Sequence, residues 1–228
     1  MRNHEPVLEL SNVNHTFGPN AQKLKILINI ELTIMPGEIV ALTGPSGAGK
    51  STLLQIAGLL ETPVNGGVSI TGQNCTRLSD YERSIIRRNS LGFVYQYHHL
   101  LAEFTAHENI VIPQILAGLP KNEANGRAEE ILSWLSLSDR AKHRPAKLSG
   151  GEQQRIAIGR AIACTPKLLL ADEPTGNLDP STADEVFMLL LKLVRGSGMA
   201  ALIATHNPTI AARMDRTLKL EQGSLVAA

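Results

Sequence analysis

Residues 38–52 read EIVALTGPSGAGKST, an apolar run followed by a glycine-rich loop. The run from Glu38 to Thr43 predicts a buried strand, and the residues from about Gly49 to Leu60 predict a helix. Strand, loop and helix in this order form the unit from which parallel α/β sheets are built. Because the loop fits the pattern G-x-x-x-x-G-K-[ST], the sequence predicts an α/β protein that binds phosphate groups.

The loop supplies the groups that phosphate binding needs. Its backbone N–H groups would surround the phosphates, Lys50 would reach the β and γ oxygens of a nucleotide, and Ser51 would ligate Mg²⁺. The alternative, a glycine-rich turn with an exposed lysine, is disfavoured by the flanking strand and helix. The predicted nucleotide-binding residues of the loop are Gly44, Pro45, Ser46, Gly47, Ala48, Gly49, Lys50, Ser51 and Thr52.

Two carboxylates end a second apolar strand, predicted from Lys167 to Asp172. They would lie beside the phosphate loop at the carboxyl edge of the sheet, where ligands bind in such folds. Asp172 suits the shell of Mg²⁺, and Glu173 is suited to orient and deprotonate an attacking water. The alternative is that this acidic pair only caps the following turn.

Three further residues are candidates for the same site. Gln96 follows the apolar stretch Leu91–Tyr95 and could contact Mg²⁺ or the water, and His206 follows the predicted strand Ala200–Thr205 and could donate to a γ-phosphate oxygen. Phe17, in a polar loop, either stacks on adenine or packs in the core. The predicted catalytic residues are Glu173, His206 and Gln96, and the predicted metal ligands are Ser51, Gln96 and Asp172.

A second anion site is predicted in the stretch LSGGEQQR, residues 148–155. Ser149 and Glu152 have the spacing of a capping box, so Ser149 should begin a helix. Gly150 and Gly151 let a ligand approach the backbone, and the helix N-terminus attracts a terminal phosphate. The alternative is an ordinary capped helix. Since the chain already has one phosphate loop, this second site indicates that the working unit contains two chains.

Composition excludes several classes of protein. The 228 residues carry a formal net charge of +1, which gives no electrostatic reason to expect a nucleic acid or an anionic membrane as partner. Cys75 and Cys164 match no metal or redox spacing and are expected to be reduced structural thiols. With no apolar run of about 18 to 20 residues and no signal-peptide pattern at the N-terminus, the protein is expected on the cytosolic side.

The rest of the chain divides into three parts. Alternating apolar residues at Val7–Val13 and Ile26–Ile34 predict antiparallel strands, and the segment Thr182–Val194 predicts a crossover helix of the parallel sheet. Capping boxes at Ser79 and Thr105 begin a mostly helical span, in which Trp134 and Leu135 are expected in the core. We expect an antiparallel β subdomain at about 1–35 and 60–75, a core at 36–59, 76–95 and 160–228, and a helical subdomain at 96–159.

Taken together, the motifs resemble, in order and spacing, the ATP-binding subunits of ABC transporters; they are Gly44–Thr52, Gln96, Leu148–Gln153, Leu168–Glu173, Asn177–Asp179 and His206. The resemblance implies one domain over residues 1–228, with a RecA-like P-loop NTPase core, and it implies ATP hydrolysis with ATP and Mg²⁺ as cofactors. It also implies a head-to-tail dimer in which Ser149, Gly150 and Gly151 contact the ATP of the opposite subunit. Asp179 would lie in the loop that crosses this interface.

The stretch Phe93–Asn109 narrows the resemblance to the lipoprotein-releasing group of these ATPases, because it contains the pair His98-His99. Ala102 and His107 depart from the group's usual proline and leucine. The resemblance implies two integral inner-membrane subunits of the LolC/LolE type as partners, lipoprotein cargo handled indirectly, no nucleic acid, and a peripheral location on the cytoplasmic face of the inner membrane. The alternatives are a macrolide-exporter-type ATPase and an FtsE-like regulatory ATP switch of cell division.

Overall fold

The computed structural model describes residues 5–18 and 24–227 of the chain. The strands are β1 (Leu8–Phe17), β2 (Leu24–Ile34), β3 (Ile39–Thr43), β4 (Asn65–Ile70), β5 (Gln73–Asn74), β6 (Leu91–Tyr95), β7 (Leu168–Asp172), β8 (Ala200–Ala204), β9 (Arg216–Glu221) and β10 (Ser224–Ala227). The helices are α1 (Lys50–Ala57), α2 (Asp80–Ser90), α3 (Ala106–Leu116), α4 (Lys121–Trp134), α5 (Gly150–Ile162), α6 (Pro180–Ser197) and α7 (Pro208–Ala211), with 3-10 turns η1 (Ser138–Arg140) and η2 (Pro145–Lys147).

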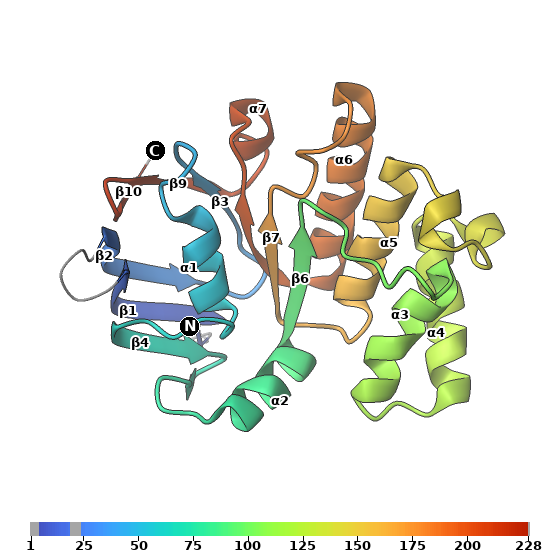
Figure 1. Ribbon diagram of the computed structural model, residues 1–228, viewed down its shortest axis with the longest axis horizontal. Coiled ribbons are helices and arrows are strands. Elements are labelled where there is room, and N and C mark those ends of the chain that lie inside the picture. The colour runs from blue at the N-terminus through green and yellow to red at the C-terminus, as the bar shows by residue number, and fades with distance from the viewer. Residues whose placement is uncertain (1–4, 19–23, 228) are drawn as a thin grey trace.

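A six-stranded sheet forms the centre of the molecule, in the order β10-β9-β3-β8-β7-β6 (Figure 1). All its neighbouring strands are parallel except β9 and β10, which form an antiparallel hairpin. A separate antiparallel sheet has the order β2-β1-β4-β5. The predicted fold class, a mostly parallel sheet with an antiparallel sheet and helices, is therefore confirmed.

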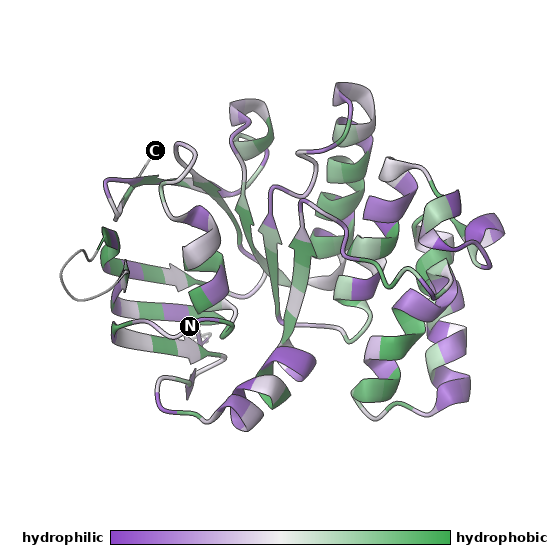
Figure 2. Cartoon of the chain, in the orientation of Figure 1, coloured by the Kyte–Doolittle hydropathy of each residue, from purple (hydrophilic) through white to green (hydrophobic). Residues whose placement is uncertain are grey.

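Both faces of the parallel sheet are buried, as the continuous apolar runs of its strands predict. Leu168 and Leu170 of β7 pack on the side of α1 and the antiparallel sheet, whereas Leu169 and Ala171 pack on the side of α5 and α6. Figure 2 shows the central strands coloured as hydrophobic over most of their length. Burial on both faces fixes the register of each strand in the sheet. The register in turn fixes where the residues after each strand lie.

The antiparallel strand β2 departs from the alternation that its sequence predicts. Leu27 and Ile30 face the core, whereas Ile26 and Ile28 are only partly buried. The cause is a break in register between β1 and β2, where Asn29 has a positive φ of 48°. Such a bulge reverses which residues face the core. As a result, Ile26 lies against the phosphate loop instead of the interior of the sheet.

The helices α3, α4 and α5 enclose a hydrophobic cluster of their own. The predicted capping boxes at Ser79, Thr105 and Ser149 are confirmed, and each begins a helix. The prediction for Leu135 is confirmed, because it is buried, but the prediction for Trp134 is wrong. Trp134 is 54% exposed at the end of α4 and lines an open groove together with Leu189 and Leu193 of α6.

Candidate active site

The carboxyl ends of four parallel strands meet at one edge of the sheet. Tyr95, Asp172, Ala204 and Leu42 are in register across β6, β7, β8 and β3. The residues that follow these four strands are therefore neighbours along the edge, in the order Gln96, Glu173, Thr205–His206 and Gly44. Most of the residues predicted to carry the chemistry are thus brought together by strand register alone.

The phosphate loop joins β3 to α1 at this edge. Lys50 is buried, and its ammonium donates to the carbonyl oxygens of Gly44 and Pro45 at 2.9 and 3.0 Å. An ammonium has three N–H donors, so two hold the loop and a third can reach a ligand. Ser51 and Thr52 follow in the first turn of α1, with Ser51 exposed.

The N-terminus of α1 differs from those of the other long helices at this edge. Helices α5 and α6 begin with side-chain caps, whereas α1 begins at Gly49 with no side-chain cap and no acidic residue in its first turn. Gly49 has a φ of 105°, and a Cβ there would lie 2.7 Å from Cγ2 of Ile26. Glycine is thus required twice over, and the uncapped N–H groups with the helix dipole form a site for an anion.

Glu173 and His206 form a pair beside the loop. The Nδ1 atom of His206 contacts the Oε2 atom of Glu173, whose side chain is 19% exposed. Glu173 has a positive φ of 46°, a strained conformation for a residue with a side chain. A cavity of about 240 Å³, lined by both residues and by Thr205 and Gly176, opens beside the carboxylate.

Gln96 is held by Asn177, a contact that the sequence analysis did not predict. Its Nε2 donates to Oδ1 of Asn177 at 2.9 Å, and Nδ2 of Asn177 donates back to the Gln96 carbonyl at 3.1 Å. The loop after β6 and the loop after β7 are thus joined by a reciprocal pair of hydrogen bonds. The Oε1 atom of Gln96, the atom that can ligate a cation, is not used in this pair.

The predicted second anion site begins α5. Ser149 Oγ accepts from Glu152 N at 3.2 Å and Glu152 Oε2 accepts from Ser149 N at 2.8 Å, so the capping box is complete. This arrangement and an ion pair with Arg140 lower the pKa of Glu152 below its usual value. The backbone N–H groups of Gly150 and Gly151, at the first two helical positions, are not used by the box.

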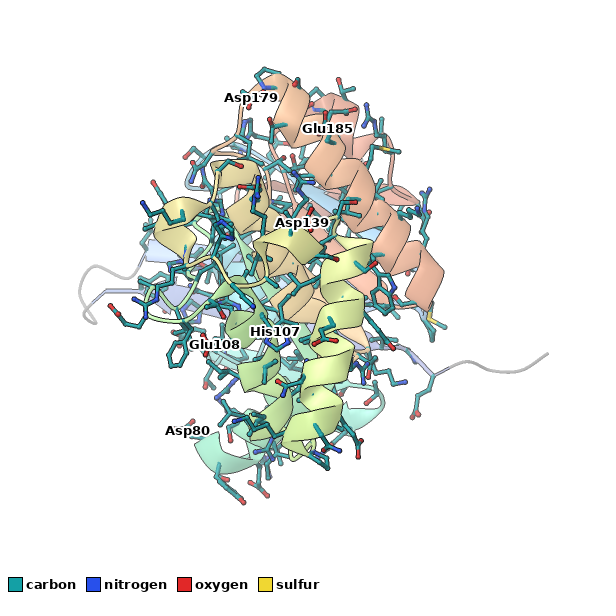
Figure 3. All side chains as sticks on the ribbon, turned by 90° about the vertical axis from the view of Figure 1, so that its right-hand side faces the viewer. Asp80, His107, Glu108, Asp139, Asp179 and Glu185 are labelled. Atoms are coloured by element: carbon teal, nitrogen blue, oxygen red, sulfur yellow. The ribbon has the colours of Figure 1, made fainter. Side chains whose placement is uncertain are left out.

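Two residues of the following loop and helix lie directly against this motif. A Cβ at Gly151 would lie 2.5 Å from Cγ2 of Thr182, and a Cβ at Gly150 would lie 3.4 Å from Leu178. Asp179 caps α6 by accepting from Thr182 N at 3.1 Å, a bond that lowers the pKa of Asp179. Asp179 is exposed at the start of α6 (Figure 3), and the closeness of Gly150 and Gly151 to Leu178 and Thr182 puts it on the same surface as the exposed Ser149.

Helix α5 also holds the segment around Gln96 in place. The sequence analysis did not predict this contact. Gln154 is fully buried; its Nε2 donates to the Tyr95 carbonyl at 3.2 Å and its Oε1 contacts Nδ1 of His98. Arg160 donates to the carbonyls of His98 and His99, at 2.9 and 2.6 Å. The sequence did contain a signal for this contact. Gln154 is a polar residue four positions before Ile158, so it lies on the apolar stripe of the helix.

Phe17 does not lie in a loop, as predicted, but at the last position of β1, because strand pairing with Leu24 extends β1 beyond Val13. Its ring is 46% exposed and meets the ring of His15 edge to face, with centroids 4.7 Å apart. The alternative that Phe17 packs in the core is therefore wrong. None of the helices in residues 5–18 and 24–227 is both long enough and apolar enough to cross a membrane.

Comparison with known proteins places these motifs in a family. The family model described as ABC transporter matches residues 27–176. The lipoprotein-releasing system ATP-binding protein LolD 1 of Rhodospirillum rubrum is 59% identical over 98% of this chain and 99% of its own length. The protein LolD of Paramagnetospirillum magneticum is 58% identical over 99% of both chains.

Solved structures agree with the sequence matches. A dimeric ATP-binding cassette, MJ0796, captured in a post-hydrolysis state with ADP and Pi, superposes with a TM-score of 0.87 at 38% identity over 96% of both chains. Another dimeric structure of MJ0796 has a TM-score of 0.88 at 39% identity, also over 96% of both chains. Since the family model covers more than half of the chain and the relatives match its full length, this chain belongs to the ABC transporter family of ATPases, in the group of LolD ATP-binding proteins.

Proposed function

We propose that this ABC ATPase drives the release of lipoproteins from the bacterial inner membrane, bound to the cytoplasmic face of that membrane. The observation that carries the proposal is the 59% identity, over 98% of the chain, to an ATP-binding protein of a lipoprotein-releasing system. The pair His98-His99 supports the same assignment, because the stretch Phe93–Asn109 that contains it resembles the lipoprotein-releasing group.

The phosphate loop is proposed to bind the nucleotide. Residues 44–52 would surround the phosphates with N–H groups, and the third N–H of Lys50 would reach the β and γ oxygens. Phe17, exposed at the end of β1, would stack on the adenine. Ser51, Asp172 and Gln96 offer a hydroxyl, a carboxylate and an amide oxygen; this all-oxygen set fits Mg²⁺, which would neutralise phosphate charge.

Hydrolysis is assigned to the edge between β7 and β8. Glu173 would accept the proton of a water as the water oxygen attacks the γ-phosphorus and the bond to ADP breaks. His206 contacts the same carboxylate and would hold its orientation, while a ring N–H donates to the γ-phosphate. The strained backbone of Glu173 supports this role, because strain is retained where function needs an exact side-chain direction.

We also infer that two copies work head to tail. The phosphate loop begins α1 and the Ser149 motif begins α5, and these two helices lie apart in Figure 1. Each chain therefore presents two separate anion sites. A partner chain turned by half a rotation would bring its Ser149, Gly150 and Gly151 to the γ-phosphate on the first chain. Asp179, on the same surface as Ser149, would cross the interface.

The membrane subunits are proposed to dock on the segment between β6 and α3. This segment exposes large apolar side chains, with exposed fractions of 68% for Tyr97, 42% for Leu101 and 41% for Phe104. Exposed apolar groups gathered on one segment mark an interaction site. Gln96 begins this segment, so a movement of the docked subunit would displace Gln96 and thereby be transmitted to the nucleotide site.

Depletion of the protein in its host tests the cargo. Outer-membrane lipoproteins should then accumulate in the inner membrane, and a plasmid copy should restore their distribution whereas the Lys50→Ala variant should not. An unchanged distribution, together with a block in cell division, would instead favour an FtsE-like role. Purification of the chain from membranes followed by mass spectrometry should recover two integral membrane proteins of the LolC/LolE type.

A further inference from the structure

A large cavity lies away from the nucleotide edge. It is a groove of about 830 Å³, and its lining includes Pro166 and Lys167, which precede β7, and Met199, which precedes β8. Nucleotide-site residues follow the carboxyl ends of these strands, whereas the groove adjoins their amino ends. The groove is therefore at the opposite edge of the parallel sheet.

Two helix faces form the walls of the groove. Arg127, Ile131 and Trp134 lie at spacings of four and three on α4, and Leu189, Leu193 and neighbouring residues lie on one face of α6. Figure 3 shows α4 toward the viewer, with α6 running down the right-hand side of the view. Most of the lining is apolar, and a volume of this size is in the range of about 300–1,000 Å³ that small-molecule sites occupy.

The charged groups of the groove are mostly positive. Arg127, Lys167 and Lys192 line it, against one carboxylate, that of Glu5. Within residues 5–18 and 24–227, no carboxylate lies within 4.0 Å of any of these three cationic groups. An apolar groove with cations at its rim matches a molecule that has an apolar body and an anionic head.

We propose that this groove binds a single-chain amphiphile with an anionic head group, of the fatty-acid class. The chain of the ligand would lie against Trp134, Ile131 and Leu193, and its head group would meet the cations at the rim. Lysine and arginine suit this place, because their apolar stems line the groove while their charges stay in water. Since one wall belongs to α4 and the other to α6, the bound molecule would touch both the helical part and the core.

Trp134 makes the proposal directly measurable, because it is the only tryptophan in the chain. Titration with dodecanoate below its micelle concentration should shift the fluorescence of Trp134 to the blue and saturate. Decanoate, two methylenes shorter, should bind roughly tenfold more weakly, as the burial of each methylene predicts. Dodecyltrimethylammonium, which has the same chain length and the opposite charge, should bind at least about tenfold more weakly than dodecanoate.

Charge-removing variants test the head-group contact. The variant Arg127→Gln/Lys167→Gln/Lys192→Gln should lose at least about tenfold in dodecanoate affinity while its ATP binding stays normal. Lys121→Gln/Lys142→Gln/Lys147→Gln changes net charge by the same amount at exposed positions outside the groove, and should bind dodecanoate like the wild type.

Three results would overturn the proposal. The first is an absence of saturable fluorescence change, and the second is an equal response to the anionic and cationic amphiphiles, which would indicate apolar adsorption only. The third is saturable binding by a chain that lacks residues 2–4 but not by the full chain, which would make the protein's own N-terminal residues the occupant. Normal ATP binding by a variant would show that it is folded, so a loss of dodecanoate binding could not be attributed to misfolding.

Discussion

The side-chain amide of Gln154 donates a hydrogen bond of 3.2 Å to the main-chain oxygen of Tyr95, although 59 residues separate them in the chain. Tyr95 is the last residue of β6 and directly precedes Gln96, whereas Gln154 belongs to the helix that Ser149 begins. The bond therefore connects the loop of the proposed metal ligand to the motif proposed to contact the ATP of a partner. Any displacement of α5 relative to β6 has to break it or carry Tyr95 along.

Replacing this amide should destabilise the fold. Gln154→Leu keeps the volume of the side chain but leaves the partly buried Tyr95 carbonyl and His98 Nδ1 without their partner. Leaving such groups unpaired costs about 1–3 kcal/mol, and the free energy of unfolding measured in urea should fall by that amount. Gln55→Leu, an exposed change on α1, is the control; equal effects of the two substitutions would contradict the prediction.

A methyl group at Gly151 should interfere with the contact between α5 and α6. The new Cβ would lie 2.5 Å from Cγ2 of Thr182, so Gly151→Ala should lower the free energy of unfolding by about 1–3 kcal/mol. Thr182→Ser removes that methyl group, and the next atom of residue 182 is 4.0 Å away. The double variant Gly151→Ala/Thr182→Ser should therefore regain most of the stability in urea unfolding.

The neighbouring glycine provides the matched control. A Cβ at Gly150 would meet Leu178 at 3.4 Å, an ordinary contact, so Gly150→Ala should change stability little. Dimerisation with ATP, measured by size-exclusion chromatography, separates packing from ligand contact. If the double variant is stable but does not dimerise, residue 151 also approaches the phosphate; if neither variant loses stability, the proposed overlap with Thr182 is wrong.

The sequence was sufficient to predict the fold class and the edge where the site lies, because both follow from local patterns. An apolar run buried on both faces predicts a parallel strand, and residues after such strands meet at one edge whatever their separation in the chain. Gln96, Glu173 and His206 were predicted at this edge in this way, and the strand register brings them there. The register of β6, β7 and β8 is sufficient to make these residues neighbours.

Contacts between side chains from distant segments were not predictable in the same way. Asn177 bonds Gln96 across 81 residues, and the facing direction of Ile26 depends on a bulge at Asn29 that alternation alone does not reveal. Trp134 ends an apolar helix face and was expected in the core. Trp134 instead lines an open groove between α4 and α6, and the packing of these two helices is not encoded in a local pattern.

Removing the proposed general base should separate ATP binding from hydrolysis. Glu173→Gln keeps the shape of the side chain but cannot accept the proton of the water, so the rate of ATP hydrolysis should fall by at least about 100-fold. Nucleotide affinity should change little, because the phosphate loop is untouched. The variant should accumulate as an ATP-bound dimer, measurable by size-exclusion chromatography and by phosphate release.

A second acidic residue serves as the control for this change. Glu185 is exposed on α6 (Figure 3), and its side chain makes no hydrogen bond or ion pair among the described residues. Glu185→Gln should hydrolyse ATP at the wild-type rate. Near-normal turnover by Glu173→Gln would show that Glu173 is not the general base and would favour His206 in that role.

Acid should weaken the start of α3 through Glu108. Its carboxylate accepts hydrogen bonds of 2.8 Å from both the backbone N–H and the hydroxyl of Thr105, which lower the pKa of Glu108 below 4.5. A pKa that is lower in the folded state stabilises the protein above the unfolded value, and this contribution disappears as the pH falls through the folded value.

The wild type should therefore be more stable than Glu108→Gln by about 0.3–1 kcal/mol at pH 7, the usual range for a carboxylate at an exposed helix N-terminus. Urea unfolding at stepwise lower pH should show this difference shrinking below pH 4.5, because the protonated carboxyl then resembles the amide. Glu130→Gln, on an exposed part of α4, should show no such trend. A difference between wild type and Glu108→Gln that stays constant with pH would mean that shape, and not charge, stabilises the helix start.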